Sequence, residues 1–211
     1  MKRLLMLFLC MSLLATTAFV ACGDSSSADS DSSSETTNAK GKFVDSRDGQ
    51  TYKTLKIGTQ TWMAKNLNYK ADSSFCYDNE ESNCAKYGRF YKWDDALRAC
   101  PSGWHLPSKA EFETLIGSVG DKQFAGRYLK SKEGWSYSGN GTDAFGFSAL
   151  PAGIRGHSGN YGYEGDYAFF WSSAENNSSN AYYMSFSCFG LNASLGDTGK
   201  NIALTVRCVK D

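Results

Sequence analysis

The sequence has little proline, little histidine and no excess of charge of either sign. Its 211 residues include 3 prolines and 2 histidines, and 22 lysine and arginine residues balance 22 aspartate and glutamate residues. No run of basic residues is longer than Lys2–Arg3. Because nucleic-acid binding needs clustered cations, the sequence argues against a nucleic-acid partner. The low proline content, together with 21 glycines and 14% aromatic residues, suits a turn-rich β or α+β domain.

Side chains that carry catalysis or hold a metal are also scarce. No Cys-x-x-Cys pair occurs, so a metal cluster is not expected. His105 stands in a turn before a helix, where a structural bond to the backbone is expected, and His157 lies in a glycine-rich loop with no placed partner. The sequence therefore predicts no enzyme, no cofactor and no metal site. An enzyme stays a third alternative, which would need His157, Cys188 and a carboxylate in one cleft.

No apolar run is long enough to cross a membrane. Residues 4–14 form the longest such run, and about eleven residues cannot span a hydrocarbon core of ~30 Å. The run follows a basic start and precedes small residues, as in a signal peptide. Residues 18–22, Ala-Phe-Val-Ala-Cys, resemble the bacterial lipobox. We therefore expect a lipoprotein signal peptide at 1–21 and a lipid on Cys22; the alternative is ordinary cleavage near Ala21 with a free thiol.

The segment that follows is rich in serine and aspartate. Residues 23–42 contain no large apolar side chain and cannot offset the entropy of ordering, so we expect residues 22–42 to be a disordered tether. One interpretation is a solvated spacer, and another is an acidic signal that sorts lipoproteins to the outer surface. The expected location is the cell envelope, with the chain anchored to the membrane through Cys22, at the outer membrane and exposed at the surface.

Residues 43–211 are long enough for one folded domain. Alternating patterns predict strands at 51–57 and 61–63, and apolar spacing predicts short helices at 94–99 and 108–119. The second helix opens with a capping box, Ser108 to Glu111. After residue 129, short aromatic runs such as 145–150 are separated by glycine and serine, which indicates small strands and long loops. This order predicts the α+β class.

Five cysteines remain in the predicted domain, where an oxidising compartment favours disulfides. Turn residues lie between Cys76 and Cys84, which suits a local bridge. Cys100 at the end of the first helix and Cys208 in the last strand could join the two ends of the domain. Cys188 is then the unpaired thiol.

Four motifs resemble those of the Fibrobacter succinogenes major paralogous domain. They are residues 45–53 with 57–69, residues 100–108, residues 170–175 and residues 206–211. The resemblance covers residues 45–211. It implies a C-type-lectin-like fold, shared with formylglycine-generating enzymes, on a surface or secreted module of unassigned activity.

The sites of those two relatives are not reproduced in the sequence. Calcium-dependent sugar binding in C-type lectins uses Glu-Pro-Asn or Gln-Pro-Asp, and neither tripeptide occurs. The reactive cysteine pair of formylglycine-generating enzymes has its nearest counterpart in Cys188 and Cys208, but Cys208 is better explained by a disulfide. The resemblance therefore implies neither calcium binding nor catalysis.

Aromatic residues are concentrated between Tyr161 and Phe189. Within this stretch a loop alternates tyrosine with glycine and acidic residues, a composition that suits contact with a protein or sugar surface. We expect a polysaccharide or a surface protein to bind there. The candidate ligand-binding residues are Tyr161, Tyr163, Glu164, Asp166 and Tyr167.

Other interpretations of the aromatic residues stay open. The loop tyrosines could merely cover the core, and the domain could be a structural or assembly module of the envelope with no soluble ligand. Residues 169–171 are expected to be a core strand. Tyr182 and Tyr183 should point to opposite faces, so that one of them is exposed.

Overall fold

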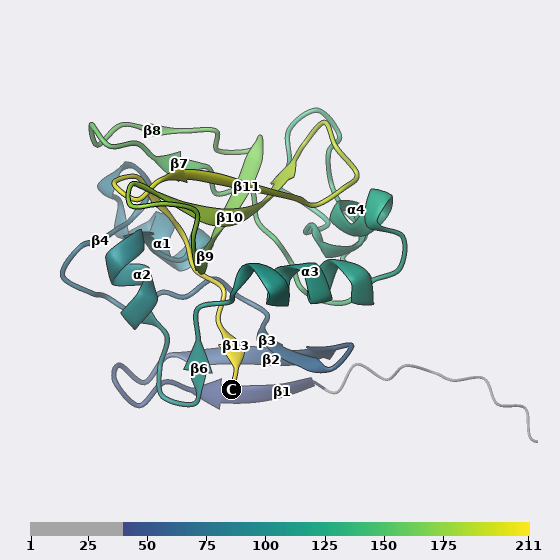
Figure 1. The fold of residues 1–211 in the computed structure, drawn as a ribbon, viewed down its shortest axis with the longest axis horizontal. Coiled ribbons are helices and arrows are strands. Elements are labelled where there is room, and N and C mark those ends of the chain that lie inside the picture. The colour runs from purple at the N-terminus through teal and green to yellow at the C-terminus, as the bar shows by residue number, and fades with distance from the viewer. Residues whose placement is uncertain (1–39) are drawn as a thin grey trace, which may run out of the picture. The chain divides into compact units, whose positions relative to one another are not determined.

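Two antiparallel hairpins open the described part of the chain, residues 40–211 of a computed structural model (Figure 1). Strands β1 (Lys40–Val44), β2 (Thr51–Ile57) and β3 (Gln60–Met63) pair in sequence order. The short strands β13 (Val209–Lys210) and β6 (Trp104–His105) complete a five-stranded sheet of order β1-β2-β3-β13-β6. The end of the chain therefore lies beside its first hairpins.

A second, eight-stranded sheet carries most of the later strands. Its main path runs β11-β10-β9-β12-β5-β4, with the β7–β8 hairpin attached at β12. All its pairs are antiparallel except β9 with β12. The strands are β4 (Ser74–Phe75), β5 (Phe90–Lys92), β7 (Ile154–Arg155), β8 (Tyr161–Gly162), β9 (Tyr167–Glu175), β10 (Asn180–Ser187), β11 (Ser194–Gly199) and β12 (Ala203–Thr205).

Four short α-helices lie within the described residues, and the α+β class is confirmed. They are α1 (Glu81–Tyr87), α2 (Trp93–Ala99), α3 (Lys109–Ser118) and α4 (Ala125–Leu129). The expectation of two helices was too low, because α1 (ESNCAKY) has few apolar residues and α4 is only five residues long. The predicted capping box is present: the Glu111 amide donates to the Ser108 hydroxyl over 3.2 Å, and the Ser108 amide donates to the Glu111 carboxylate over 2.7 Å.

Two further expectations need correction. Strand β1 begins at Lys40, before the boundary at residue 43 that composition indicates, because its backbone pairs with β2 without needing apolar side chains. Residues 145–150, expected to form a strand, contain none and make only the isolated bridge between Lys130 and Ala149. Positive φ angles at Gly146 and Ser148 break the extended backbone there.

The buried side chains of residues 40–211 form three clusters. The largest lies where α3 packs between the two sheets (Figure 1), and it holds Trp62, Phe112, Phe170 and Phe186. A second cluster joins α2 to β9 and β12, and a third lies under the β7–β8 hairpin. All five tryptophans of the sequence are buried in or beside these clusters.

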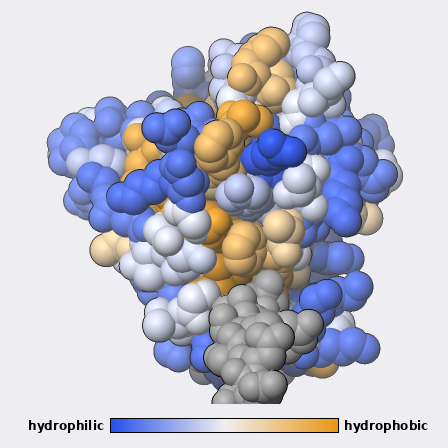
Figure 2. All heavy atoms as spheres, turned by 90° about the vertical axis from the view of Figure 1, so that its right-hand side faces the viewer, coloured by the Kyte–Doolittle hydropathy of each residue, from blue (hydrophilic) through white to orange (hydrophobic). Residues whose placement is uncertain are grey.

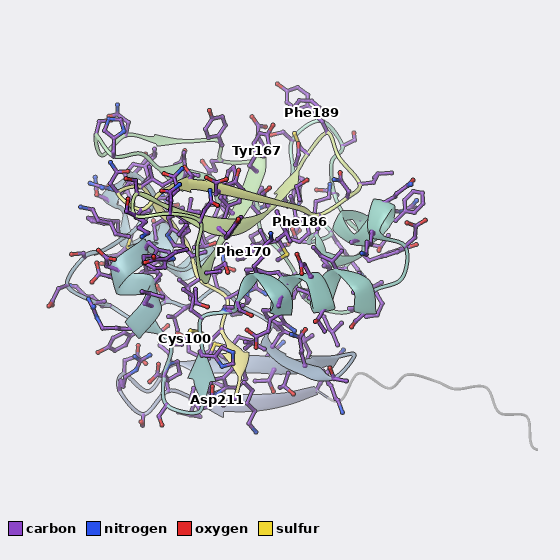
Figure 3. The ribbon with its side chains drawn as sticks, viewed as in Figure 1. Cys100, Tyr167, Phe170, Phe186, Phe189 and Asp211 are labelled. Carbon is purple, nitrogen blue, oxygen red and sulfur yellow. A yellow bond between two sulfur atoms is a disulfide. The ribbon has the colours of Figure 1, made fainter. Side chains whose placement is uncertain are left out.

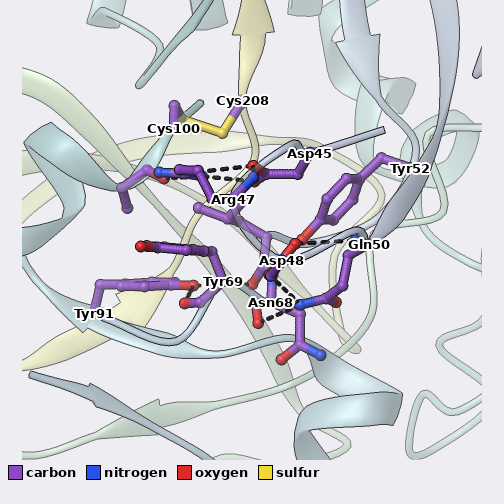
Figure 4. A network of polar contacts seen from close by, with 12 residues as sticks. Asp45, Arg47, Asp48, Gln50, Tyr52, Asn68, Tyr69, Tyr91, Cys100 and Cys208 are labelled. Carbon is purple, nitrogen blue, oxygen red and sulfur yellow. Dashed lines mark hydrogen bonds and ion pairs between the residues drawn. A yellow bond between two sulfur atoms is a disulfide. The ribbon is translucent and has the colours of Figure 1, made fainter. Parts of the chain in front are cut away.

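Residues 45–53, part of the first motif of the family resemblance, form a network of polar contacts (Figure 4). The fully buried Asp45 carboxylate accepts hydrogen bonds from Arg47 over 2.9 and 2.7 Å, and Arg47 also donates to the Ala99 carbonyl. Burial alone would raise the pKa of Asp45, but the hydrogen bonds and charge of Arg47 lower it. The network fixes the first hairpin against the end of α2, next to the Cys100–Cys208 disulfide.

Residues 40–211 contain two disulfides, Cys76–Cys84 and Cys100–Cys208, and Cys188 is free and buried. The predicted signal peptide, the lipidation site Cys22 and residues 22–39 of the tether lie outside the described residues. Among the helices of residues 40–211, none has the length and apolar character needed to cross a membrane. The C-type-lectin-like topology stays a prediction.

Candidate functional site

Strands β9 and β10 present different side chains on their two faces. Phe170 of β9 and Phe186 of β10 point into the core, with ring centroids 6.1 Å apart, whereas Tyr167 lies at the edge of the domain (Figure 3). Successive residues of a strand point to opposite faces, so Phe169 lies on the face of Tyr167. Tyr183 of β10 is paired with Trp171 and joins that same face.

Four aromatic side chains on this outer face form a continuous row, here called the aromatic row: Tyr163, Tyr167, Phe169 and Tyr183. The ring centroids of successive members are 5.6, 5.5 and 5.3 Å apart. The two central rings are stacked at 17°, and the end rings are turned by 83° and 81° from their neighbours. Tyr163 is 56% exposed and the other three are half-buried. The row offers apolar ring surface beside phenolic hydroxyls.

Backbone features hold both ends of the row in place. A Cβ atom on Gly196 of β11 would lie 2.7 Å from the Tyr183 hydroxyl, so the absence of a side chain lets the Tyr183 ring lie against β11. Tyr163 has a φ of 64°, a left-handed conformation that a bulky residue adopts only at a cost of about 1–2 kcal/mol. Such strain at an exposed aromatic residue is typical of a functional position.

The five residues predicted from the sequence to bind a ligand do not all lie together in the structure. Tyr163 and Tyr167 belong to the aromatic row. Tyr161 instead packs on Tyr77, with ring centroids 5.0 Å apart, and donates a hydrogen bond to Asn79. Tyr161 thus covers the third buried cluster, which was the alternative interpretation of the loop tyrosines.

The two acidic residues of the loop are directed elsewhere. Glu164 accepts a hydrogen bond from the Tyr87 hydroxyl over 2.6 Å and lies 3.6 Å from the Lys86 ammonium. The Asp166 carboxylate lies 3.9 Å from the Cys188 sulfur. Glu164 therefore ties the loop to α1, and Asp166 ties it to the end of β10.

Sequence reasoning missed Phe169 and left Tyr183 undecided. The unbroken run 169–171 indicated a core strand, and Trp171 is indeed fully buried, but Phe169 is only half-buried. The signal that could have found it is the two-residue spacing from Tyr167. Tyr183 is the member of its pair on the outer face, whereas Tyr182 donates its hydroxyl to Asn176 and lies beneath the Lys109 ammonium.

His105 and the free cysteine have structural surroundings. His105 bonds two carboxylates, Asp211 over 2.6 Å at Nδ1 and Glu111 over 2.8 Å at Nε2, instead of the backbone. Burial would lower the pKa of His105, but these two carboxylates raise it. Both ring nitrogens are therefore occupied, and His157 is exposed in the β7–β8 turn.

Cys188 is buried under a close backbone crossing. A Cβ atom on Gly139 would lie 2.4 Å from the Cys188 carbonyl oxygen, so the 139 segment covers the thiol directly. Burial and the neighbouring Asp166 charge raise the pKa of Cys188. The protonated thiol is a poor nucleophile.

Metal-ligating side chains come together at one place in the described residues, where Cys76, Glu81 and Cys84 lie within 4.8 Å of one another. The two sulfur atoms are bonded to each other in a disulfide. A disulfide sulfur is not a thiolate ligand, so this group does not fit a metal ion.

A second exposed aromatic group lies beyond the end of β10. Phe189 is 72% exposed and Tyr137 is 75% exposed, and their rings are stacked 5.1 Å apart (Figure 3 labels Phe189). Leu191 follows and is also exposed. Figure 2 shows hydrophobic side chains gathered in a band on the face that carries α4, with hydrophilic residues on both sides. The group of Tyr137, Phe189 and Leu191 is the surface most suited to a protein contact.

Comparison with known families identifies a match. The family model described as the Fibrobacter succinogenes major domain matches residues 55–210, a range that includes the whole aromatic row. No curated protein and no solved structure matches the chain. Since the family model spans well over half of the sequence, the chain belongs to the Fibrobacter succinogenes major domain family.

Proposed function

We propose that this domain binds a polysaccharide through the aromatic row, without catalysis. The observation that carries the proposal is the continuity of the four rings, each within 5.3–5.6 Å of the next on one open sheet face. Sugars present apolar C–H surface between hydroxyl groups, and tyrosine matches both with a ring and a polar tip. If Cys22 is lipidated, the tether would display this face from the cell envelope.

The open part of the sheet face supports this function. Next to the row, β12 and β5 carry Leu204 and Tyr91, which are fully buried, so the same face is covered there. The part around the row stays accessible; Tyr167, Phe169 and Tyr183 lie on strands, and Tyr163 lies in the short turn between β8 and β9. A rigid platform keeps the entropic cost of binding low.

The test is polysaccharide binding by the purified full-length protein in detergent, on an array of plant and bacterial polysaccharides. We expect Tyr167→Ala and Tyr183→Ala each to lower the affinity for the polysaccharide by about tenfold, the effect of losing one buried aromatic contact. Tyr163→Asn is a third variant, because asparagine tolerates the left-handed backbone at this position.

The matched control is Tyr182→Ala. It removes the same kind of side chain from the neighbouring position of β10, but on the face covered by α3. An unchanged affinity in Tyr182→Ala alongside the losses in the row supports the proposal. Equal losses in Tyr182→Ala and Tyr183→Ala, or no binding to any polysaccharide by the folded protein, would refute it.

A protein partner is the second candidate function, favoured by the exposed Phe189 and Tyr137 pair. In that case the domain serves as an assembly module of the envelope. A photocrosslinking residue at position 189 in intact cells should then join the chain to one defined envelope protein. A residue at position 56, exposed on β2 of the other sheet, is the control and should give no such product.

A further inference from the structure

A cleft of about 710 Å³ lies between the β1–β2 hairpin, the segment after β3, helix α1 and the 146–150 loop. This volume is in the range typical of small-molecule and oligosaccharide sites. Its charged lining residues are all lysines, and no aspartate, glutamate or arginine lines it. The lysines are Lys40, Lys42, Lys53, Lys65 and Lys86.

The positive charge of the cleft is almost uncompensated. Among these five ammonium groups, only that of Lys86 lies within 4.0 Å of a carboxylate of residues 40–211, namely 3.6 Å from Glu164. All five lysines are exposed, so their charges are directed to the solvent or to a bound molecule. An anion in the cleft would meet attraction with no opposing carboxylate in the lining.

Two of the lysines face each other directly across the β1–β2 ladder. Lys42 is the partner of Lys53 in the antiparallel register, and partners in a ladder share a face of the sheet. Like charges in directly opposite positions destabilise a strand pair. The hairpin therefore carries a repulsion that a bound anion would relieve.

A buried cation lies under the floor of the cleft. Arg207 is fully buried, and its guanidinium donates to the Asn66 side-chain oxygen over 2.6 Å and to backbone carbonyls, including that of Ser148. Asn66 and Ser148 themselves line the cleft. The nearby Asp143 carboxylate bonds Ser148, and no carboxylate of residues 40–211 forms an ion pair with Arg207. The Asp143 charge offsets part of the Arg207 charge, so the positive potential of the cleft comes mainly from the lysines of its walls.

We propose that this cleft is a second binding site, separate from the aromatic row, for an oligosaccharide that carries carboxylates, such as a chain of uronate residues. Lysines on β1, β2, α1 and the segment after β3 would pair with successive carboxylates. Neutral polar groups of the same lining offer partners for sugar hydroxyls, and they are Gln50, Thr51, Thr54, Asn68 and Ser148.

The lining fits a carboxylated sugar better than a nucleic acid. Bidentate recognition of phosphate favours arginine, and single-stranded nucleic acids need exposed aromatic rings for base stacking. The lining has no arginine, and its one aromatic residue, Tyr52, is buried. The cleft is also far larger than a single small anion, which favours a ligand with several charges.

The test uses the full-length protein in detergent and titrates it with a galacturonate oligosaccharide. The matched ligand is the same oligosaccharide with its carboxylates methyl-esterified. We expect the acid to bind with an affinity that falls as salt increases, and the ester to bind about tenfold more weakly or not at all.

Paired variants locate the binding. Lys42→Gln/Lys53→Gln should lower the affinity for the acid by about tenfold, as expected for the loss of two exposed ion pairs, without lowering the urea midpoint of unfolding. The control Lys56→Gln/Lys132→Gln makes the same charge change at exposed lysines outside the cleft and should bind as the unmodified protein does.

The proposal would be overturned by equal binding of acid and ester, by equal losses in the two lysine variants, or by tighter binding of a single-stranded oligonucleotide than of the uronate. Tyr167→Ala separates this site from the aromatic row. It should bind the uronate as tightly as the unmodified protein does, and a loss there would move the ligand to the aromatic row and refute the cleft.

Discussion

The two disulfides enclose loops of very different length, and this difference predicts their separate contributions to stability. Cys100 and Cys208 are 108 residues apart, and Cys76 and Cys84 are 8 residues apart. In the chain-entropy model, closing a loop of the first size destabilises the unfolded chain by about 4.7 kcal/mol, and closing the second by about 2.5 kcal/mol. Removing the long bridge should therefore lower the free energy of unfolding by about 2 kcal/mol more.

The comparison uses two double variants, Cys100→Ala/Cys208→Ala and Cys76→Ala/Cys84→Ala. Cys76, Cys84 and Cys208 are buried and Cys100 is half-buried. Removing the sulfur atoms should therefore cost a similar amount of packing energy in the two variants. The difference between the variants then reports mainly on loop length. Since typical domains have only about 5–15 kcal/mol of stability, the Cys100→Ala/Cys208→Ala variant should be close to marginal.

Urea unfolding followed by tryptophan fluorescence measures both losses, because all five tryptophans are buried in the native state. The dependence of the unfolding free energy on urea should also become steeper without the long bridge, since the unfolded chain expands further. Equal losses in the two variants, or a larger loss without the Cys76–Cys84 bridge, would refute the argument from loop length.

Three further predictions concern single side chains. Ser108→Ala removes the hydroxyl that caps α3 and should cost about 1 kcal/mol in urea unfolding, whereas Ser108→Asp should keep the cap; equal losses would contradict this role. Lys130→Met should cost about 2 kcal/mol, because the buried ammonium donates to two backbone carbonyls that would lose their partner, and an unchanged midpoint would contradict it. The raised pKa of His105 gives stability that is present below its unfolded value of about 6.5 and is lost as pH rises through the folded value. Asp211→Asn should lower the His105 pKa measured by NMR, and no change would show that Asp211 does not interact with it.

Features that depend on neighbouring residues could be predicted from the sequence. The capping box of α3 lies within four residues, and the apolar stripe that follows it repeats at helical spacing, so both are visible in the chain. Helix α1 has few apolar residues and α4 is only five residues long, so neither shows such spacing, and both were missed. They form because surrounding segments hold them in place: the Cys76–Cys84 disulfide closes onto α1, and the backbone at Gly126 in α4 meets that of Asn192.

The aromatic row could be predicted only in part. Tyr163 and Tyr167 stand out by composition, but their ring partners depend on which face of β9 and β10 the fold leaves open. The alternation of residues along β9 cannot show that Trp171 is covered by α2 while Phe169, two residues earlier on the same face, stays half-buried. Tyr161 is the opposite case. The composition of its loop suggested contact with a ligand, but its ring packs against the third cluster.

The cleft lined by the five lysines could not be predicted from runs of charge in the sequence. Its five lysines are spread over residues 40–86 with no two adjacent, and the chain as a whole is electrically balanced. Pairing of β1 with β2 and the return of the chain through α1 place them around one space. The absence of a basic run therefore does not show that cations are unclustered. The prediction that no nucleic acid binds depends instead on the composition of the lining, which has neither the arginine forks that grip phosphates nor an exposed ring on which a base could stack.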